Sequence, residues 1–208
     1  EQRKYIMCDA GSGKYRLGLR TYIIGASCTS QSGFEPLINI MNSVTESTQE
    51  TSQFGILEGG NVLYVAKKDS PQAIRMISWV GTKLPANATA IGKALLSDLT
   101  DEQIRDLYRD GLPKLTEHTI SDMDLLLGQI EQIRCGEIAT ETEESTPQMR
   151  CFAVPIRQNG RVDAALSISV PIFRYTDEKR VQICQCLREA QQQIEQLVGL
   201  YNFELIKP

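Results

Sequence analysis

Residues 84–97 read LPANATAIGKALLS, and this stretch predicts the start of a helix that is suited to hold a ligand. Asn87 and Thr89 are two candidate N-caps, and strong helix formers follow them. The start of a helix presents unpaired backbone N–H groups and a partial positive charge, so it can bind an anion. No large side chain stands between Ala86 and Ala90, which would let a small ligand reach that backbone. An ordinary capped helix is the alternative, and the residues of this stretch alone favour it.

Apolar periodicity and turn signals on both sides of this stretch predict alternating helices and strands. Before it we expect a hairpin over 3–18, helices over 17–29 and 34–44, a polar run over 45–53 that closes the second helix, and strands over 54–58, 62–66 and 73–80. After it we expect helices capped by Thr100 or Asp101 and by Ser121, strands over 137–143, 150–157 and 161–172, and a last helix over 176–201. Hairpins on both sides of the central helices predict an α+β fold, in which helices pack on a largely antiparallel six-stranded sheet.

Composition is that of an ordinary globular chain, with 41% hydrophobic and 23% charged residues among 208. No apolar run reaches membrane-spanning length and no signal peptide opens the sequence, so we expect a cytoplasmic protein without a membrane partner. The six cysteines include no C-x-x-C pair, which suits a reducing compartment and indicates neither a metal site nor a cofactor. Because the sequence begins with Glu1 and runs at once into a strand-like segment, we expect a shortened or proteolysed form of a longer chain.

Charge is distributed unevenly along the chain. Residues 1–20 hold five basic and two acidic side chains, which gives them a net charge of +3. Since the whole chain has a net charge of −4, the remaining residues carry −7. The acidic body is a poor electrostatic match for a phosphate backbone. The basic start is typical of the remnant of a nucleic-acid-binding domain, or else of a solvated tail.

Ser167 and Ser169 lie in the strand-like segment ALSISV and would share one face of that strand. Two hydroxyls in register can donate to a carboxylate or accept from a sugar hydroxyl. The equally weighted alternative is that this face is the wet side of the sheet. The residues themselves do not decide between a binding row and a solvated row.

An acidic run of Glu141, Glu143 and Glu144 ends the strand before the Cys151 strand. Paired carboxylates can act as acid and base or bind ligand hydroxyls, but such a run is more often a solvated strand edge. Cys151 is similarly either a pocket thiol or, as the residue type favours, a small buried hydrophobe.

No catalytic motif is visible. His118 is the single histidine, and its loop contains no nucleophile motif, so we expect it on the surface. Arg75, Lys93 and Arg150 are possible countercharges for a ligand, and their spacing selects none of them.

Three stretches together carry a resemblance to a known family. LPANATAIGKALL, at residues 84–96, resembles the signature of the effector-binding domain of IclR-type bacterial transcriptional regulators. Residues 141–174 are similar to that family's acidic strand followed by its Cys-x-Ala-x-Pro and Ser-x-Ser-x-Pro strands, and residues 13–26 resemble the end of its winged-helix domain running into a linker helix. The three stretches occur in the family's order and cover nearly the whole chain.

The resemblance implies a domain organisation and a function. Residues 1–16 would be the remnant wing hairpin of a winged-helix DNA-binding domain, 17–31 a linker helix, and 32–208 a GAF-like effector-binding domain. The chain would form homodimers or homotetramers and sense a small carboxylate or sugar acid. Operator DNA would be read by the missing N-terminal domain as a dimer. Whether it represses or activates is left open.

The resemblance also implies site residues, with no catalytic and no metal-binding ones among them. The effector would contact Ala90, Ile91, Glu141, Cys151, Ser167 and Ser169. Glu141 stands where the family most often has Asp, and some members have Gly-Ala at positions 90 and 91, so we expect a pocket of altered shape. A small GAF-like enzyme using Cys151 or Glu141 is the alternative, although no activating base is near Cys151 in sequence. A third possibility is an oligomerisation module that binds no ligand.

Overall fold

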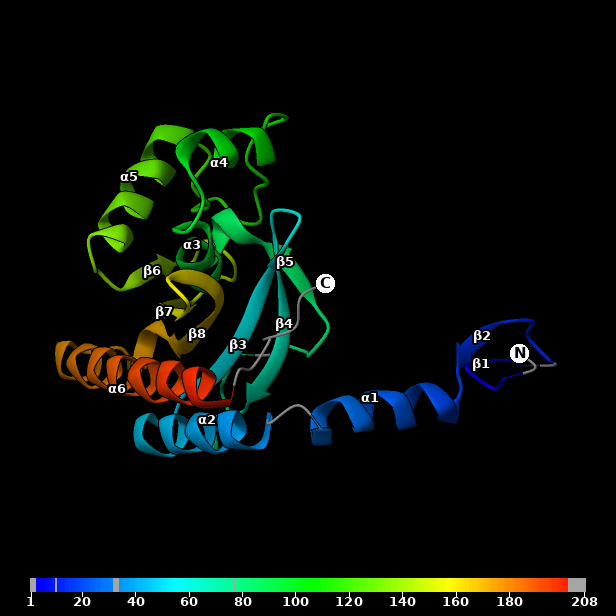
Figure 1. Ribbon diagram of the computed structural model, residues 1–208. Helices are drawn as coiled ribbons and strands as arrows, with labels where there is room; N and C mark the ends of the chain where they lie inside the picture. The colour runs from blue at the N-terminus through cyan, green and yellow to red at the C-terminus, as the bar shows by residue number, and fades with distance from the viewer. Residues whose placement is uncertain (1–2, 10, 32–33, 77, 202–208) are drawn as a thin grey trace. The chain divides into compact units, whose positions relative to one another are not determined.

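The computed structural model describes residues 3–9, 11–31, 34–76 and 78–201 (Figure 1). The chain forms two compact units, residues 1–38 and 39–208. In the first unit, β1 (Ile6–Cys8) pairs antiparallel with β2 (Tyr15–Leu17), and α1 spans Leu19–Gln31. The predicted hairpin and helix are therefore present, whereas the predicted domain boundaries after residues 16 and 31 stay predictions.

The second unit is built on one six-stranded sheet. Its strands are β3 (Thr51–Glu58), β4 (Asn61–Lys68), β5 (Lys83–Pro85), β6 (Ala139–Thr142), β7 (Met149–Gln158) and β8 (Arg161–Pro171). They are ordered β5-β4-β3-β8-β7-β6, and every neighbouring pair is antiparallel. The predicted α+β class and antiparallel six-stranded sheet are confirmed.

Helices cover both faces of this sheet (Figure 1). They are α2 (Phe34–Thr48), α3 (Ala90–Leu96), α4 (Asp101–Leu107), α5 (Met123–Arg134) and α6 (Asp177–Tyr201), with short 3₁₀ turns η1 (Ala86–Ala88) and η2 (Ile172–Arg174). The central stretch forms η1 and α3, and α3 packs on β7 and β8 from one face. On the opposite face α6 packs on the same two strands, and α2 runs beside α6.

Small residues let α3 lie close to the sheet. Ala90 and Ala94 on α3 belong to one buried cluster with Ala153 on β7 and Ala165 on β8. Alternate residues of β7, such as Cys151 and Ala153, reach this cluster because successive side chains of a strand point to opposite faces. The close fit of α3 against the middle of the sheet positions the site described below.

The predicted strand over residues 73–80 is wrong. Residues 73–76 and 78–80 are not in a strand, and the edge strand is β5 instead. Trp79 and Thr82 form a turn through the hydrogen bond from Thr82 N to Trp79 O, and Gly81 has a φ of 86°. β-propensity expresses itself only where a neighbouring strand supplies partners, and the backbone hydrogen bonds to β4 begin at Gly81 and Thr82, directly before β5.

Two further boundaries differ from prediction. Asp122, not Ser121, caps α5, because its carboxylate accepts from the N–H groups of Asp124 and Leu125. The polar run 45–53 ends α2 at Thr48 as expected, but Thr51–Gln53 begins β3 and is buried. Thr100 caps α4 with a full capping box, as one of the two predicted caps.

Candidate functional site

The start of α3 is fixed by a side-chain cap and by a close backbone approach. Thr89 is the N-cap, and its hydroxyl accepts from Gly92 N at 3.0 Å. Asn87, the other predicted cap, lies in η1 and donates to Pro113 O instead. A Cβ on Gly92 would lie 2.1 Å from Ala86 O, so only glycine lets α3 fold back on η1.

A small cavity lies between the start of α3 and the sheet. Its volume is about 10 Å³, which is about what one water molecule needs. The side chains around it come from β3, β4, α3, β7, β8 and three connecting segments: Gln53, Tyr64, Met76, Thr89, Ala90, Ile91, Ser145, Cys151, Ser167 and Ser169. Its walls are therefore mostly uncharged hydrogen-bonding groups with a few apolar side chains.

Five of the six residues predicted for effector contact line this one cavity. They are Ala90, Ile91, Cys151, Ser167 and Ser169. The sixth, Glu141, lies directly behind two lining residues. Its carboxylate accepts from Ser145 Oγ at 3.0 Å, and it also interacts with the Cys151 thiol. Residues that are up to 79 positions apart in sequence, Ala90 and Ser169, thus come together in one place.

The serine row faces the protein interior. Ser167 and Ser169 are both buried, so the interpretation of this face as the wet side of the sheet is wrong. The Cys151 thiol donates to Ser169 Oγ at 3.3 Å, and Ser169 Oγ donates to Gln53 Oε1 at 3.0 Å. Gln53 Nε2 in turn donates to Ser78 Oγ at 2.6 Å. One hydrogen-bonded chain therefore joins β7, β8 and β3 to the segment that follows β4.

The acidic run is not a solvated edge. Glu141 is 2% and Glu144 6% exposed, while Glu143 is half-buried. A loop from a distant part of the chain covers this turn, because Thr116 Oγ1 donates to Glu143 O and Thr119 Oγ1 to Glu144 O, each at 2.6 Å. The strand-edge interpretation fails since a strand pattern contains no information about that loop.

Lys93 is fully buried beside this acidic turn. Its Nζ donates to Glu144 Oε1 at 2.6 Å, to Gln129 Oε1 at 2.8 Å and to Thr140 O at 3.3 Å. Three acceptors that cannot donate require three N–H bonds, which only the ammonium form supplies. Burial lowers the pKa of Lys93, and the Glu144 carboxylate opposes that shift. The Lys93 ammonium group therefore pairs with Glu144 and has no N–H left for a ligand.

The other two predicted countercharges lie elsewhere. Arg75 contacts Asp69 and Gln72 O on the exposed segment after β4. The Arg150 guanidinium lies 4.4 Å from the ring centroid of Tyr175 and also contacts the Phe152 ring. None of the predicted countercharges Arg75, Lys93 and Arg150 lines the cavity.

Burial shifts the pKa values of the ionisable groups in and behind the cavity toward their neutral forms. Burial and the nearby Glu141 raise the pKa of the Cys151 thiol well above its ordinary value, so Cys151 is a poor nucleophile. Burial also raises the pKa of the Tyr64 hydroxyl. Burial raises the pKa of Glu141, although hydrogen bonds from Cys151, Glu144 and Ser145 oppose the shift.

Five cavity residues were not predicted as ligand contacts. They are Gln53, Tyr64, Met76, Ser145 and Thr89, the last of which was predicted only as a helix cap. Gln53 stood in a polar run assigned to a helix end, and Met76 in a strand that does not form. Alternation along β4 could have placed Tyr64 inward, since Val62, Tyr64 and Ala66 are buried in turn. Nothing local marked Ser145.

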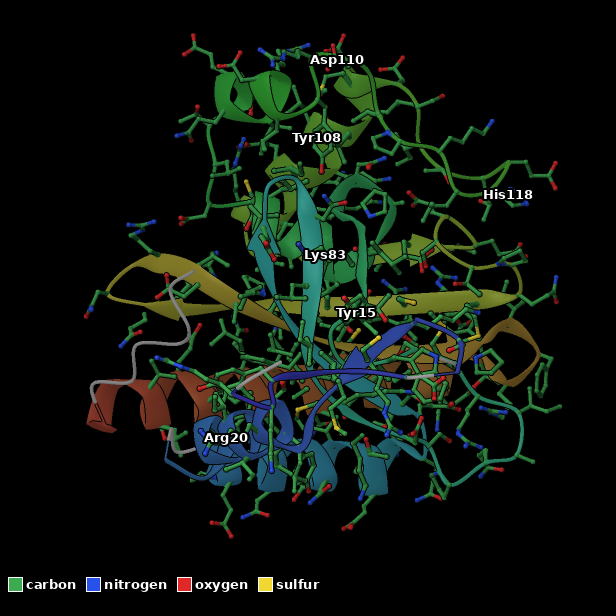
Figure 2. All side chains as sticks on the ribbon, turned by 90° about the vertical axis from the view of Figure 1, so that its right-hand side faces the viewer. Tyr15, Arg20, Lys83, Tyr108, Asp110 and His118 are labelled. Atoms are coloured by element: carbon green, nitrogen blue, oxygen red, sulfur yellow. The ribbon has the colours of Figure 1, made fainter. Side chains whose placement is uncertain are left out.

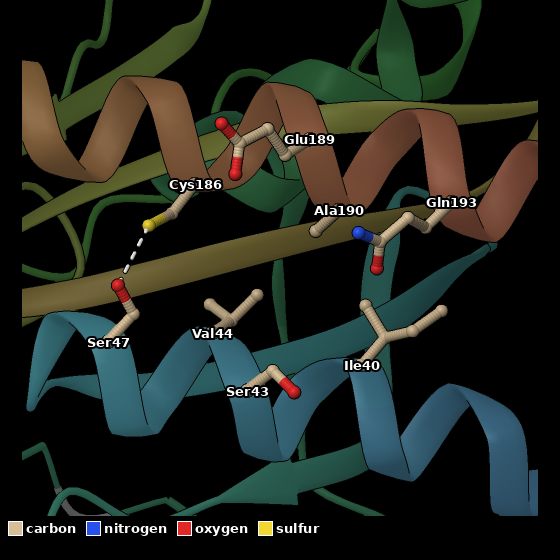
Figure 3. Close-up of a pocket in the computed structure, with 8 residues that line it drawn as sticks. All are labelled: Ile40, Ser43, Val44, Ser47, Cys186, Glu189, Ala190 and Gln193. Carbon is tan, nitrogen blue, oxygen red and sulfur yellow. Dashed lines mark hydrogen bonds between the residues drawn. The ribbon is translucent and has the colours of Figure 1, made fainter.

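The other surface features of the second unit do not bring the predicted effector-contact residues together. A groove of about 170 Å³ lies between α2 and α6, where Ile40 and Val44 face Ala190, and Cys186 Sγ lies 3.4 Å from Ser47 Oγ (Figure 3). The His118 side chain points outward and is 52% exposed, as predicted (Figure 2).

Within the described ranges no group of acidic, cysteine and histidine side chains is arranged to hold a metal. Among those same residues no helix is both long and apolar enough to cross a bilayer.

Comparison with known proteins decides the family. Residues 34–196 match the family described as bacterial transcriptional regulator IclR C-terminal. The chain belongs to the IclR family. The HTH-type transcriptional regulator KdgR of Dickeya chrysanthemi is 30% identical over 202 residues, which cover 96% of this chain and 66% of KdgR. The chain thus spans just under two thirds of that relative.

Solved IclR structures share the fold. The IclR regulator from Alicyclobacillus acidocaldarius has a TM-score of 0.87 at 22% identity, covering 96% of this chain and 81% of that chain. An IclR homologue from Microbacterium hydrocarbonoxydans, solved in complex with 4-hydroxybenzoate, has a TM-score of 0.79 at 23% identity, covering 94% and 80%. IclR proteins are transcriptional regulators and not enzymes, so this chain is a regulator C-terminal domain. The alternative of an enzyme using Cys151 or Glu141 is wrong.

Proposed function

We propose that residues 32–208 sense a small carboxylate or sugar-acid metabolite, bound in the cavity at the start of α3. The proposed contacts are Ala90, Ile91, Glu141, Cys151, Ser167 and Ser169. The observation that carries the proposal is the convergence of five of these residues on one small, hydrogen-bonding cavity. Concave pockets with a few converging polar groups are the usual sites for small ligands.

The lining side chains must move when an effector fills the cavity. A volume of about 10 Å³ accepts little more than one water molecule, so an effector must displace lining side chains. Met76 is the lining residue from the segment after β4, and Ser78 of that segment bonds Gln53. Both residues lie outside the strands, so their movement would enlarge the cavity without disturbing the sheet. The carboxylate bound by the Microbacterium homologue supports the ligand class.

Regulation would follow from linkage between the effector and DNA. An effector that prefers one arrangement of the protein shifts the DNA-binding equilibrium by its difference in affinity for the two arrangements. We infer that residues 1–16 end a winged-helix domain that reads operator DNA in the cytoplasm, and that α1 connects it to the effector domain. The basic side chains of residues 1–20 support contact with DNA backbone.

We also propose that the chain assembles as a homodimer or homotetramer. Ile74, Trp79 and Val80 are large apolar side chains that lie well exposed on one segment, and a second copy of the chain would remove them from water. Sedimentation equilibrium tests this proposal, with an expected mass two or four times that of one 23.2 kDa chain. A single-chain mass at micromolar concentration contradicts it.

A thermal-shift screen tests the ligand class. The panel holds short monocarboxylates, 2-oxo acids, aldonic acids and 4-hydroxybenzoate. A ligand at about 100 times its Kd stabilises the folded state by roughly 2.7 kcal/mol, which raises Tm by several degrees in a chain of this size. The shift should vanish in Ser167→Ala and persist in Ser43→Ala, whose position lies in the α2–α6 groove. A shift that ignores Ser167→Ala, or no shift with any acid, contradicts the proposal.

A further inference from the structure

The site must bind an anion without a positive side chain of its own. Its lining residues are all uncharged apart from the ionisable thiol and phenol, which burial keeps neutral. Lys93 is the nearest buried cation, and all three of its N–H bonds are occupied by Glu144, Gln129 and Thr140. A bound carboxylate would therefore find no ammonium or guanidinium partner among the described residues.

Glu141 is a buried acid that also lacks a cation. No lysine or arginine in the described part of the chain lies within ion-pair distance of its carboxyl group, although the side chain is 2% exposed. A buried, unpaired carboxylate is costly, and the usual outcome is that it takes a proton. Glu144 differs, because its Oε1 is paired with Lys93 at 2.6 Å.

The two oxygens of Glu141 have different surroundings. Oε2 accepts from two backbone groups, Glu144 N at 2.8 Å and Ser145 N at 3.4 Å, which can only donate. Oε1 faces the Ser145 hydroxyl at 3.0 Å, a group that can either donate or accept. A carboxylic acid also fits this arrangement, if its carbonyl oxygen accepts from the amides and its O–H donates from Oε1 to Ser145 Oγ in place of the reverse bond.

The groups that face Glu141 act in both directions: burial and the Glu144 charge raise its pKa, and the hydrogen bond from Cys151 lowers it. Glu144 follows β6, Lys93 lies on α3, Cys151 on β7 and Tyr64 on β4. Cys151 and Tyr64 are neutral, and Lys93 and Glu144 cancel one another. A second ionised carboxylate from an effector would meet an ionised Glu141 as a like charge, and two such groups in one site share a proton.

We propose that Glu141 serves in the effector site as a neutral carboxylic acid, whose O–H donates to the site while the effector carries the single negative charge. This inference rests on the proposed function for the identity of the ligand, but the protonation of Glu141 is testable without any ligand. Two consequences follow. The site prefers monoanions to dianions of the same size, and its affinity for a monoanion falls once the pH rises above the titration midpoint of Glu141.

The first experiment titrates Glu141 in the ligand-free chain. Protein labelled with ¹³C at the glutamate carboxyl carbons is followed by NMR against pH, and the signal absent from Glu141→Gln belongs to Glu141. If Glu141→Gln does not fold, Ser145→Ala assigns the Glu141 signal instead, because it should perturb that signal. We expect a midpoint well above 4.5, the ordinary value for glutamate. A midpoint at or below 4.5 overturns the inference.

The second experiment measures binding of matched acids by calorimetry across neutral pH. The pairs are propanoate with malonate and 4-hydroxybenzoate with terephthalate. The monoanion should bind at least about tenfold more tightly, and its affinity should fall about tenfold per pH unit above the midpoint, as uptake of one proton requires. Glu141→Gln should remove the pH dependence of whatever monoanion binding remains, whereas the exposed control Glu102→Gln should keep both the affinity and its pH dependence.

The outcomes separate this inference from the proposed function. Equal or tighter binding of the dianions, or pH-independent binding in the unaltered chain, overturns the neutral Glu141. If none of the four acids binds at any pH, the carboxylate-sensing function fails for this panel, and the NMR midpoint still decides whether Glu141 carries the proton.

Discussion

Lys93 Nζ lies 2.6 Å from Glu144 Oε1, and both side chains are buried near the candidate cavity. Lys93 comes from α3, the helix whose first residues line the cavity, while Glu144 follows the strand of Glu141. The ion pair therefore fixes the helix start against the acidic turn. The ion pair also occupies Lys93, which the sequence indicated as a possible countercharge for a ligand.

Lys93→Met should destabilise the fold strongly, because it leaves the Glu144 carboxylate buried without its partner. Breaking a buried pair on one side costs about 3–5 kcal/mol. The double variant Lys93→Met with Glu144→Gln should recover a large part of that loss. Urea unfolding of the two single variants and the double variant measures the coupling, and additive losses would show that the two side chains do not act as a pair.

Gly92→Ala should prevent the close approach of α3 to η1. The added Cβ would lie 2.1 Å from Ala86 O, a contact with backbone that cannot move aside cheaply. We expect a loss of more than about 3 kcal/mol, as for severe overpacking. Gly128→Ala is the matched control, since Gly128 lies inside α5 with open space around it and should gain about 0.5–1 kcal/mol. Similar effects of both substitutions on urea unfolding would contradict the close approach.

Stability should depend on pH through Glu141 with a defined sign. Because its pKa is raised in the folded chain, the folded state holds more protons than the unfolded state between the ordinary value of 4.5 and the raised value. Stability therefore falls as the pH rises through that interval and levels off above it. Urea midpoints of the unaltered chain and Glu141→Gln, measured from about pH 4 to about pH 8, should diverge in this direction. A difference that stays constant with pH is the opposing result.

Gln53→Leu should weaken the link between the serine row and the segment after β4. Ser169 Oγ and Ser78 Oγ each lose a hydrogen-bond partner, and leaving such a buried group unpaired costs about 1–3 kcal/mol. The single tryptophan, Trp79, follows Ser78 and should report the change as a shift in fluorescence emission. Gln192→Leu on the exposed side of α6 is the control and should stay within about 0.5 kcal/mol. Unchanged emission and stability in Gln53→Leu would show that the link is unimportant.

Much of the fold was predictable because it is written in local patterns. The hairpin turns at Gly59-Gly60 and Asn159-Gly160, with strands on either side, define β3 with β4 and β7 with β8. Residues 73–80 carried an equally good local pattern, yet the described residues 73–76 and 78–80 form no strand, since a strand also needs an edge to pair with. That second requirement depends on the path of the whole chain.

The candidate site was predictable in part for a similar reason. The serine row and the start of α3 are local features that the family resemblance singles out, so Ser167, Ser169, Ala90 and Ile91 could be named once that resemblance was recognised. The burial of Glu141 and Glu144 depends on Lys93 and on the loop of Thr116 and Thr119, all distant along the chain. Acidic runs are usually exposed to solvent, so the sequence favoured a solvated strand edge, and that interpretation is wrong.

The most direct test of the account locates the bound acid by methyl NMR. Addition of 4-hydroxybenzoate, and separately of pyruvate, to protein with labelled isoleucine and methionine methyl groups should shift the signals of Ile91 and Met76, which line the cavity. The signal of Ile40, in the groove between α2 and α6, should stay in place. Shifts at Ile40 with Ile91 and Met76 unchanged, or no shift at saturating concentrations of either acid, would contradict the assignment of this cavity as the effector site.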